Sequence, residues 1–198
     1  MNIAITNGSL SSLILSHMIL DSNLSKSINI TIFDEKAEIG FPNSGSGLLI
    51  NKNKIFNLLE TWCENFTFLP SINEDNNMIF NRSWLEKDLV YSLVKKGVDV
   101  KVKTSTEIVS STELLLSGAN DIESNWIGDL IINCNKDVNN NNYSIKAGSL
   151  ELLSDDIMSE DSIEIIKDVP INFIDYNIDF AFNESEKLMK QYFDDNDK

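Results

Sequence analysis

Gly8 stands between two apolar segments, in a turn whose surroundings suit phosphate binding. The sequence predicts an alternating apolar strand at residues 3–6 and a helix with apolar residues at helical spacing over residues 10–20. It predicts a second strand at residues 28–33, which Asp34 follows directly. A glycine in such a turn lets the backbone approach a pyrophosphate at the helix N-terminus, and an acid after the second strand can bind a ribose. The pattern therefore predicts a βαβ unit that binds a dinucleotide.

The turn carries only part of the dinucleotide fingerprint G-x-G-x-x-G. Gly8 occupies the second glycine position, while Thr6 and Ser11 occupy the first and third. These two residues add a Cβ where the motif has none, although each hydroxyl can donate a hydrogen bond. An ordinary strand-to-helix connection without a ligand is the alternative interpretation. For the ribose, Asp34 is the preferred ligand and Glu35 the near alternative, and a solvated strand end is the competing interpretation.

Composition and charge exclude several functional classes. The 198-residue chain has a net charge of −15, with 31 acids against 16 bases, so it repels the phosphates of nucleic acids. His17 is the single histidine, and Cys63 and Cys134 lie far apart, which leaves neither a metal-ligand pattern nor a disulfide framework. No apolar run is long enough to span a bilayer, and the N-terminus lacks a basic leader. We expect a soluble, cytoplasmic protein without a metal site, a nucleic-acid partner or a transmembrane segment.

The remaining segments continue the alternation of strands and helices. Ser83 and Glu86 have the spacing of a capping box at the start of one helix, and Gly97 is placed to end it. The other expected elements are a helix at 54–66, strands at 78–80, 98–102 and 129–133, strands of a hairpin or meander at 107–116 and around Trp126, and a helix at 182–193. This order predicts an α/β fold with a Rossmann-like parallel sheet and a small β-meander.

Four stretches of the sequence carry a family likeness beyond this general pattern. They read ITNGSLS at residues 5–11, FDEKAEIGFP at 33–42, NRSWLEKDL at 81–89 and GDLIINCN at 128–135. Together they resemble the flavin-binding part of the geranylgeranyl reductase-type, FixC-like flavoproteins, which makes the expected sheet one of the FAD/NAD(P)-binding type. The E-I-G-x-P segment is the most specific match. The fourth stretch departs from the family, because Cys134-Asn135-Lys136 replace its small Ala-x-Gly end.

The resemblance implies FAD as the cofactor and assigns residues to its parts. The implied contacts are Gly8, Ser9 and Ser11 at the pyrophosphate, Asp34 or Glu35 at the ribose, and Arg82, Gly45 and Gly47 nearer the flavin. Arg82 is the single arginine of the chain, and a helix-entry ion pair is the alternative interpretation of it. Gly45 and Gly47 lie in a turn-rich segment, where plain loop flexibility is the alternative.

The chain is expected to form one FAD/NAD(P)-binding-like domain over residues 1–198. The family likeness covers residues 1–136, and residues 137–198 form a reduced remainder with a C-terminal helix. Family members carry a substantial substrate-binding sheet in this part of the chain, for which residues 137–198 are too few. The resemblance therefore implies a protein partner that supplies a substrate domain.

Two functions from different classes follow from these observations. The first is an FAD-binding oxidoreductase-like protein related to geranylgeranyl reductase-type flavoproteins, in which the flavin transfers hydride and the protein positions it. The second is a non-catalytic, cofactor-deficient descendant that serves as an interaction or regulatory module, because glycines are missing from several cofactor contacts. Binding of a smaller nucleotide at the helix N-terminus is a third alternative. No residue is identified as a catalytic acid or base.

Overall fold

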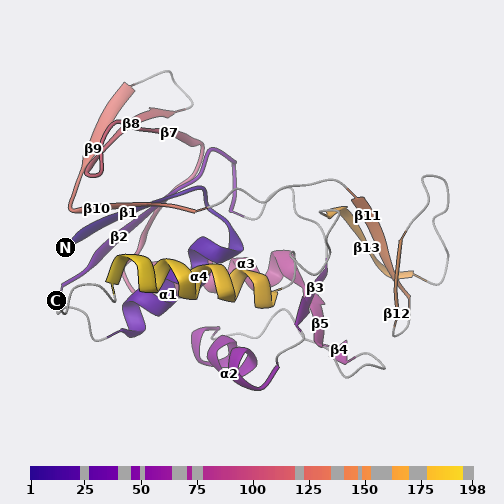
Figure 1. The fold of residues 1–198 in the computed structure, drawn as a ribbon. Helices are drawn as coiled ribbons and strands as arrows, with labels where there is room; N and C mark the ends of the chain where they lie inside the picture. The colour runs from indigo at the N-terminus through magenta and orange to yellow at the C-terminus, as the bar shows by residue number, and fades with distance from the viewer. Residues whose placement is uncertain are drawn as a thin grey trace.

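A parallel sheet lies between a layer of helices and an antiparallel meander (Figure 1). The computed structural model describes residues 1–22, 27–39, 46–49, 52–63, 71–72, 78–118, 123–134, 141–146, 149–152, 162–169 and 178–193. The predicted α/β fold class is confirmed.

The central sheet has four parallel strands. They are β1 (Asn2–Thr6), β2 (Asn29–Phe33), β6 (Asp99–Lys101) and β10 (Leu130–Asn133), in the order β10-β1-β2-β6. In this register Ile5 of β1 lies opposite Ile32 of β2 and Ile132 of β10. Helix α1 (Leu10–Asp21) connects β1 to β2, as the sequence predicted. Because the strands run the same way, their carboxyl ends meet at one edge, which is where α/β sheets bind ligands.

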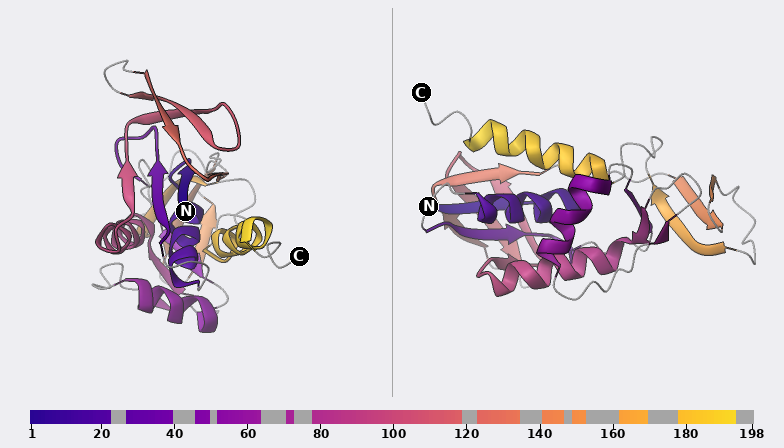
Figure 2. Two further views of the ribbon diagram at one scale, coloured as in Figure 1. Left: turned by 90° about the vertical axis from the view of Figure 1, so that its left-hand side faces the viewer. Right: turned by 90° about the horizontal axis from the view of Figure 1, so that it is seen from below.

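Helices cover one face of the sheet (Figure 2, left). Helix α1 lies between α3 (Arg82–Lys95) and α4 (Ile178–Phe193), and α2 (Lys52–Trp62) lies beneath this layer, farther from the sheet. Two helices begin earlier than expected, α3 at Arg82 rather than after Ser83, and α4 at Ile178 rather than at residue 182. Within the described residues, none of the helices combines the length and apolarity needed to cross a membrane.

Alternating side chains of the strands supply two separate cores. The larger core joins the sheet to the helices, and its strand members include Ile3, Ile5, Ile30, Ile32 and Ile132. The smaller core joins the opposite face of the sheet to the meander, and consists of Ala4, Phe33, Leu114 and Ile131 with Leu116 and Trp126 packed against it. Successive residues of a strand point to opposite faces of the sheet. When both faces are buried, neighbouring residues along a strand must therefore all be apolar.

The meander consists of β7 (Thr104–Ile108), β8 (Glu113–Gly118) and β9 (Glu123–Ile127), paired antiparallel in that order. It covers the face of the sheet opposite the helices (Figure 1). The expected meander is confirmed, but the expected strand at residues 107–116 is wrong in extent. A turn interrupts it, in which the amides of Val109 and Ser110 donate to the Glu113 carbonyl.

Two small antiparallel sheets lie beyond the carboxyl edge of the parallel strands (Figure 2, right). One has the order β3-β5-β4, formed by β3 (Ser46–Leu49), β5 (Met78–Asn81) and β4 (Ser71–Ile72). The other has the order β12-β11-β13, formed by β12 (Ser149–Leu152), β11 (Asn141–Lys146) and β13 (Ser162–Val169). The second sheet and α4 form the described part of the segment that the sequence marked as a reduced remainder.

A stack of aromatic rings joins three helices in the larger core. The ring centres of His17 on α1 and Trp62 on α2 are 4.9 Å apart, and the two rings are nearly parallel. The ring of Phe182 on α4 stacks on the Trp62 ring, with 5.6 Å between their centres. The Trp62 indole N–H donates to the Asp21 carboxylate at 2.5 Å, and His17 Nε2 lies 3.2 Å from the Leu89 carbonyl of α3. His17 is fully buried between these helices.

Burial lowers the pKa of the His17 side chain. Desolvation, with a smaller contribution from the positive charge of Lys96, lowers the pKa of His17 from 6.5 to about 4. The folded chain therefore keeps this ring neutral over a range in which the unfolded chain protonates it.

We predict that the free energy of unfolding falls as the pH is lowered from 6.5 toward 4, because the unfolded state binds a proton on His17 that the folded state does not. The contribution of this group amounts to about 3 kcal/mol over the whole range. His17→Phe keeps an aromatic ring in the stack and removes the titration. Urea unfolding of both proteins across this range measures the difference, and equal losses of stability would contradict the assignment.

Candidate functional site

The turn after β1 places an amide-lined helix start at the carboxyl edge of the sheet. Asn7 adopts a left-handed conformation with φ of 61°, and the Gly8 amide donates to the Phe33 carbonyl at 3.2 Å. Ser9 is the N-cap of α1 and forms a capping box with Ser12, in which each side chain accepts from the other residue's amide. The helix start is therefore organised by local hydrogen bonds.

Two amides of this helix start are directed outward along the helix axis. The amides of Leu10 and Ser11 occupy the first two helical positions and have no acceptor inside α1. The Ser11 carbonyl accepts from Ser185 Oγ of α4 at 2.9 Å, which holds the two helices together at this point. A helix start with such amides favours a bound anion.

Gly8 is packed directly against the side chain of Asp34. A Cβ at position 8 would lie 2.6 Å from Asp34 Oδ2 and 2.9 Å from its Cβ, closer than real Cβ atoms approach. Asp34 is buried, and its Oδ1 accepts from the Lys36 amide at 3.0 Å. In this structure the space that requires a glycine at position 8 is filled by the acid at the end of β2. The sequence interpretation attributed that requirement to the pyrophosphate.

A polar pocket of about 390 Å³ opens beside this turn, at the ends of β1, β2 and β10 and along β7. It is lined by Thr6, Asn7, Phe33, Glu35, Thr104, Ser105, Thr106, Glu107, Ile108 and Asn133. Glu35, the near alternative in the sequence interpretation, is among the lining residues, whereas the preferred Asp34 is not. The lining consists mostly of hydroxyl, amide and carboxylate side chains, a set that suits the hydroxyls of a sugar better than a phosphate.

Two asparagines form a bridge at the edge of this pocket. The Asn7 amide group donates to Asn133 Oδ1 at 2.7 Å and to the Cys134 carbonyl at 2.8 Å. Thr6 Oγ1 donates to the same oxygen of Asn133 at 2.8 Å. The sequence interpretation missed both asparagines. A usable signal was the Asn-Gly pair directly after a strand, because asparagine tolerates a positive φ better than most residues.

Two residues assigned to the flavin end, Arg82 and Gly47, lie outside the strand-end pocket. Arg82, at the start of α3, forms a buried ion pair with Glu86, with 2.6 Å between Nε and Oε1. This contact is the helix-entry ion pair that the sequence left open as an alternative. Gly47 belongs to β3 and lies opposite Phe80 of β5, and Gly45 lies outside the described residues. Neither Arg82 nor Gly47 lines the polar pocket.

Neither cysteine is placed for chemistry. Cys63 and Cys134 are both buried, and desolvation raises the pKa of each thiol to about 12. Cys134 directly follows β10, its carbonyl accepts from the asparagine bridge, and its side chain is buried. Among the described residues no group of side chains has the arrangement of a metal site.

Comparisons with known proteins identify the fold. No family model and no curated protein matches the sequence. The crystal structure of THI4 from Thermovibrio ammonificans superposes with a TM-score of 0.51 at 12% identity, covering 66% of this chain and 54% of that one. The anhydrotetracycline hydroxylase OxyS from Streptomyces rimosus gives 0.49 at 10% identity, covering 68% and 32%. CtdE, crystallised with FAD and a substrate, gives 0.46 at 8% identity, covering 70% and 38%.

These likenesses concern the fold. The parallel sheet with helices on one face and a meander on the other is a Rossmann-type sheet of the FAD/NAD(P)-binding kind. The chain spans about half the length of THI4 and a smaller share of the other two proteins.

We predict that Gly8→Ala destabilises the protein by about 1–3 kcal/mol, because the added Cβ overlaps the Asp34 side chain. In an Asp34→Gly background the same substitution is expected to cost clearly less, since the atoms it meets are gone. Chemical denaturation of the two single variants and the double variant completes a double-mutant cycle. Strictly additive costs would contradict direct packing of these two residues.

The thiols provide an independent check of the packing around β10. We predict that N-ethylmaleimide leaves the native protein unmodified at about pH 8, because both thiols are buried and protonated there. In denaturant both cysteines should react, and intact-mass spectrometry counts the adducts. Rapid modification of Cys134 in the native protein would show that this strand end is open.

Proposed function

We propose that this chain is an FAD-binding module of the flavoprotein oxidoreductase kind. The observation that carries the proposal is the polar pocket at the carboxyl ends of β1, β2 and β10, directly beside the N-terminus of α1. In open α/β sheets a ligand binds at this edge, with its phosphates at the helix start. The flavin of a bound FAD supplies hydride transfer, while the protein contributes binding and orientation.

The pocket residues fit the adenosine half of such a cofactor. Glu35 contributes a carboxylate that can accept hydrogen bonds from ribose hydroxyls, and Thr6 and Asn133 contribute polar groups at the opposite wall. The pocket has no lysine or arginine among its lining residues, so its chemistry matches a neutral nucleoside. The pyrophosphate would be held by the amides of Leu10 and Ser11, outside this pocket.

Within this proposal the two acids after β2 have different roles. Glu35 binds the ribose, because it is exposed and lines the pocket. Asp34 positions the turn, because its carboxylate is buried against Gly8 and accepts from the Lys36 amide. This division reverses the preference that the sequence alone suggested.

The assignment of residues to the flavin end of the cofactor is based on the family resemblance. Arg82 is engaged with Glu86, so in the proposal it acts by fixing the start of α3 and the adjoining β5 strand. Gly45 and Gly47 stay predictions for this end of the cofactor. The finer assignment, a relative of geranylgeranyl reductase-type flavoproteins that obtains its substrate domain from a protein partner, belongs to the same proposal.

We predict that FAD binds the purified chain and that Glu35→Gln weakens binding about tenfold or more, the range expected for losing a charged hydrogen-bond acceptor. Glu38→Gln is the matched control, because Glu38 is an exposed acid paired with Lys87 and lies outside the pocket lining. Isothermal titration with FAD and with ADP measures each protein, and the melting temperature reports its folding.

The pattern of results separates the functional alternatives. Binding of FAD that depends on Glu35 and not on Glu38 supports the proposal. Binding of ADP without FAD would favour a smaller nucleotide as the ligand. If the folded protein binds neither FAD nor ADP, the proposal of cofactor binding is overturned. The alternative of a non-catalytic, cofactor-deficient descendant that serves interaction or regulation would then be favoured.

A further inference from the structure

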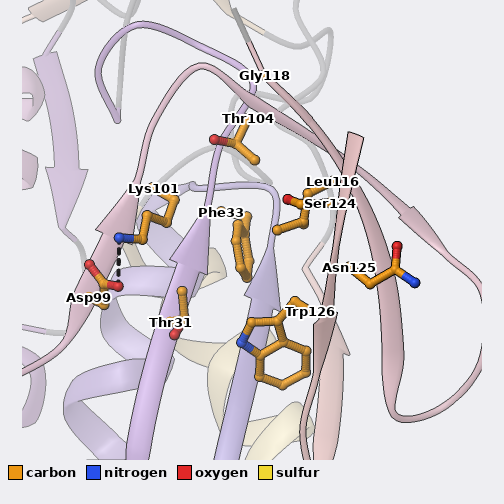
Figure 3. A pocket seen from close by; sticks show the side chains of 10 residues that line it. All are labelled: Thr31, Phe33, Asp99, Lys101, Thr104, Leu116, Gly118, Ser124, Asn125 and Trp126. Carbon is orange, nitrogen blue, oxygen red and sulfur yellow. Dashed lines mark ion pairs between the residues drawn. The ribbon is translucent and has the colours of Figure 1, made fainter. Parts of the chain in front are cut away.

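A second pocket lies between the parallel sheet and the meander (Figure 3). It has a volume of about 480 Å³ and takes its walls from β2, β6, β7, β8 and β9. This volume is within the range of small-molecule sites, and strands of two sheets form the walls, so the pocket belongs to the rigid part of the fold. It shares Phe33 and Thr104 with the strand-end pocket, and its other lining residues are different.

The pocket exists because the smaller core fills only part of the space between the two sheets. Phe33 and Trp126 meet edge to face, with 6.4 Å between ring centres. Three other lining positions carry little or no side chain, because Thr31 and Ser124 are small and Gly118 has none. Side chains of this size leave a gap beside the two rings that a ligand can enter.

The walls combine aromatic surface with a neutral polar rim. Phe33, Leu116 and Trp126 supply the apolar surface. The two charged lining residues cancel each other, because Lys101 Nζ lies 2.9 Å from Asp99 Oδ2 at one edge (Figure 3). These features favour an uncharged ligand with a flat apolar ring.

We propose that this pocket, defined by Phe33, Leu116, Trp126, Thr31, Ser124 and Gly118, is a binding site for a neutral, planar aromatic compound with a hydrogen-bonding group. Its ring lies against Trp126 and Leu116, which are partly exposed, beside the buried ring of Phe33, and aromatic surfaces pack edge to face or offset. Its polar group meets the hydroxyls of Thr31 and Ser124. The site is distinct from the proposed nucleotide site and does not depend on it, although the two are neighbours across Phe33.

The test uses prodan, a neutral naphthalene ketone whose emission shifts to the blue when it leaves water. We expect saturable binding of prodan to the wild-type 198-residue chain, with a weaker response to the anionic naphthalene probe anilinonaphthalene sulfonate. Gly118→Leu and Ser124→Phe each place a side chain into the pocket. A Cβ on Gly118 meets nothing closer than 3.9 Å, so the backbone at this position has room for a side chain.

Both filling variants should weaken prodan binding about tenfold or more, the ratio expected for losing the burial of an aromatic ring. Ser117→Leu is the matched control, because the neighbouring residue of β8 points to the opposite face and is not among the lining residues. It should change the affinity by less than about twofold, as a distant surface substitution does. Melting temperatures near that of the wild type identify the variants that are folded.

Three results would overturn the proposal. The first is an absence of saturable prodan binding to the folded wild type. The second is equal affinity in the wild type and in both filling variants. The third is displacement of prodan by ADP, which would make this space part of the nucleotide site rather than a separate one. Failure of FAD to bind leaves the prodan result intact, so the two proposals fail independently.

Discussion

The packing of Gly8 against Asp34 is the contact on which the carboxyl edge of the sheet depends. It brings the turn after β1 onto the end of β2, where the Gly8 amide also bonds to the Phe33 carbonyl. The backbone of Asp34 continues the connection, since its amide donates to Lys101 of β6 and its carbonyl accepts from Thr104 of β7. Helix α1, three strands and the first strand of the meander are thus aligned by one buried residue pair.

The two faces of the parallel sheet are packed differently. The helix face is filled by large aliphatic side chains and the His17–Trp62–Phe182 stack. The meander face has a small core around Phe33 and Trp126, and both pockets open on that side. Tight packing on one face holds the strands in place, while looser packing on the other leaves room for ligands.

Phe33 connects these features because it belongs to the smaller core and to the walls of both pockets. Its neighbour Asp34 turns inward, and the next residue, Glu35, lines the strand-end pocket. Three successive residues at the end of β2 therefore contribute packing, turn geometry and a polar ligand contact. The incomplete glycine fingerprint is compatible with this arrangement, since α1 obtains its start from the Ser9–Ser12 capping box.

The sequence by itself determined the fold class and the strands and helices of the parallel sheet, because strand alternation, helical periodicity and turn residues are local patterns. It did not predict β3, β4 or the sheet β12-β11-β13. It also located the turn at Gly8, the two acids after β2 and the alternative of an ion pair for Arg82. It could not decide which acid faces the pocket, since Asp34 and Glu35 are equivalent until Gly8 leaves space for one of them. Only the tertiary structure joined Asn7 to Asn133, which are 126 residues apart. Contacts between distant segments depend on how the sheet brings their ends together, and local sequence patterns carry no information about that distance.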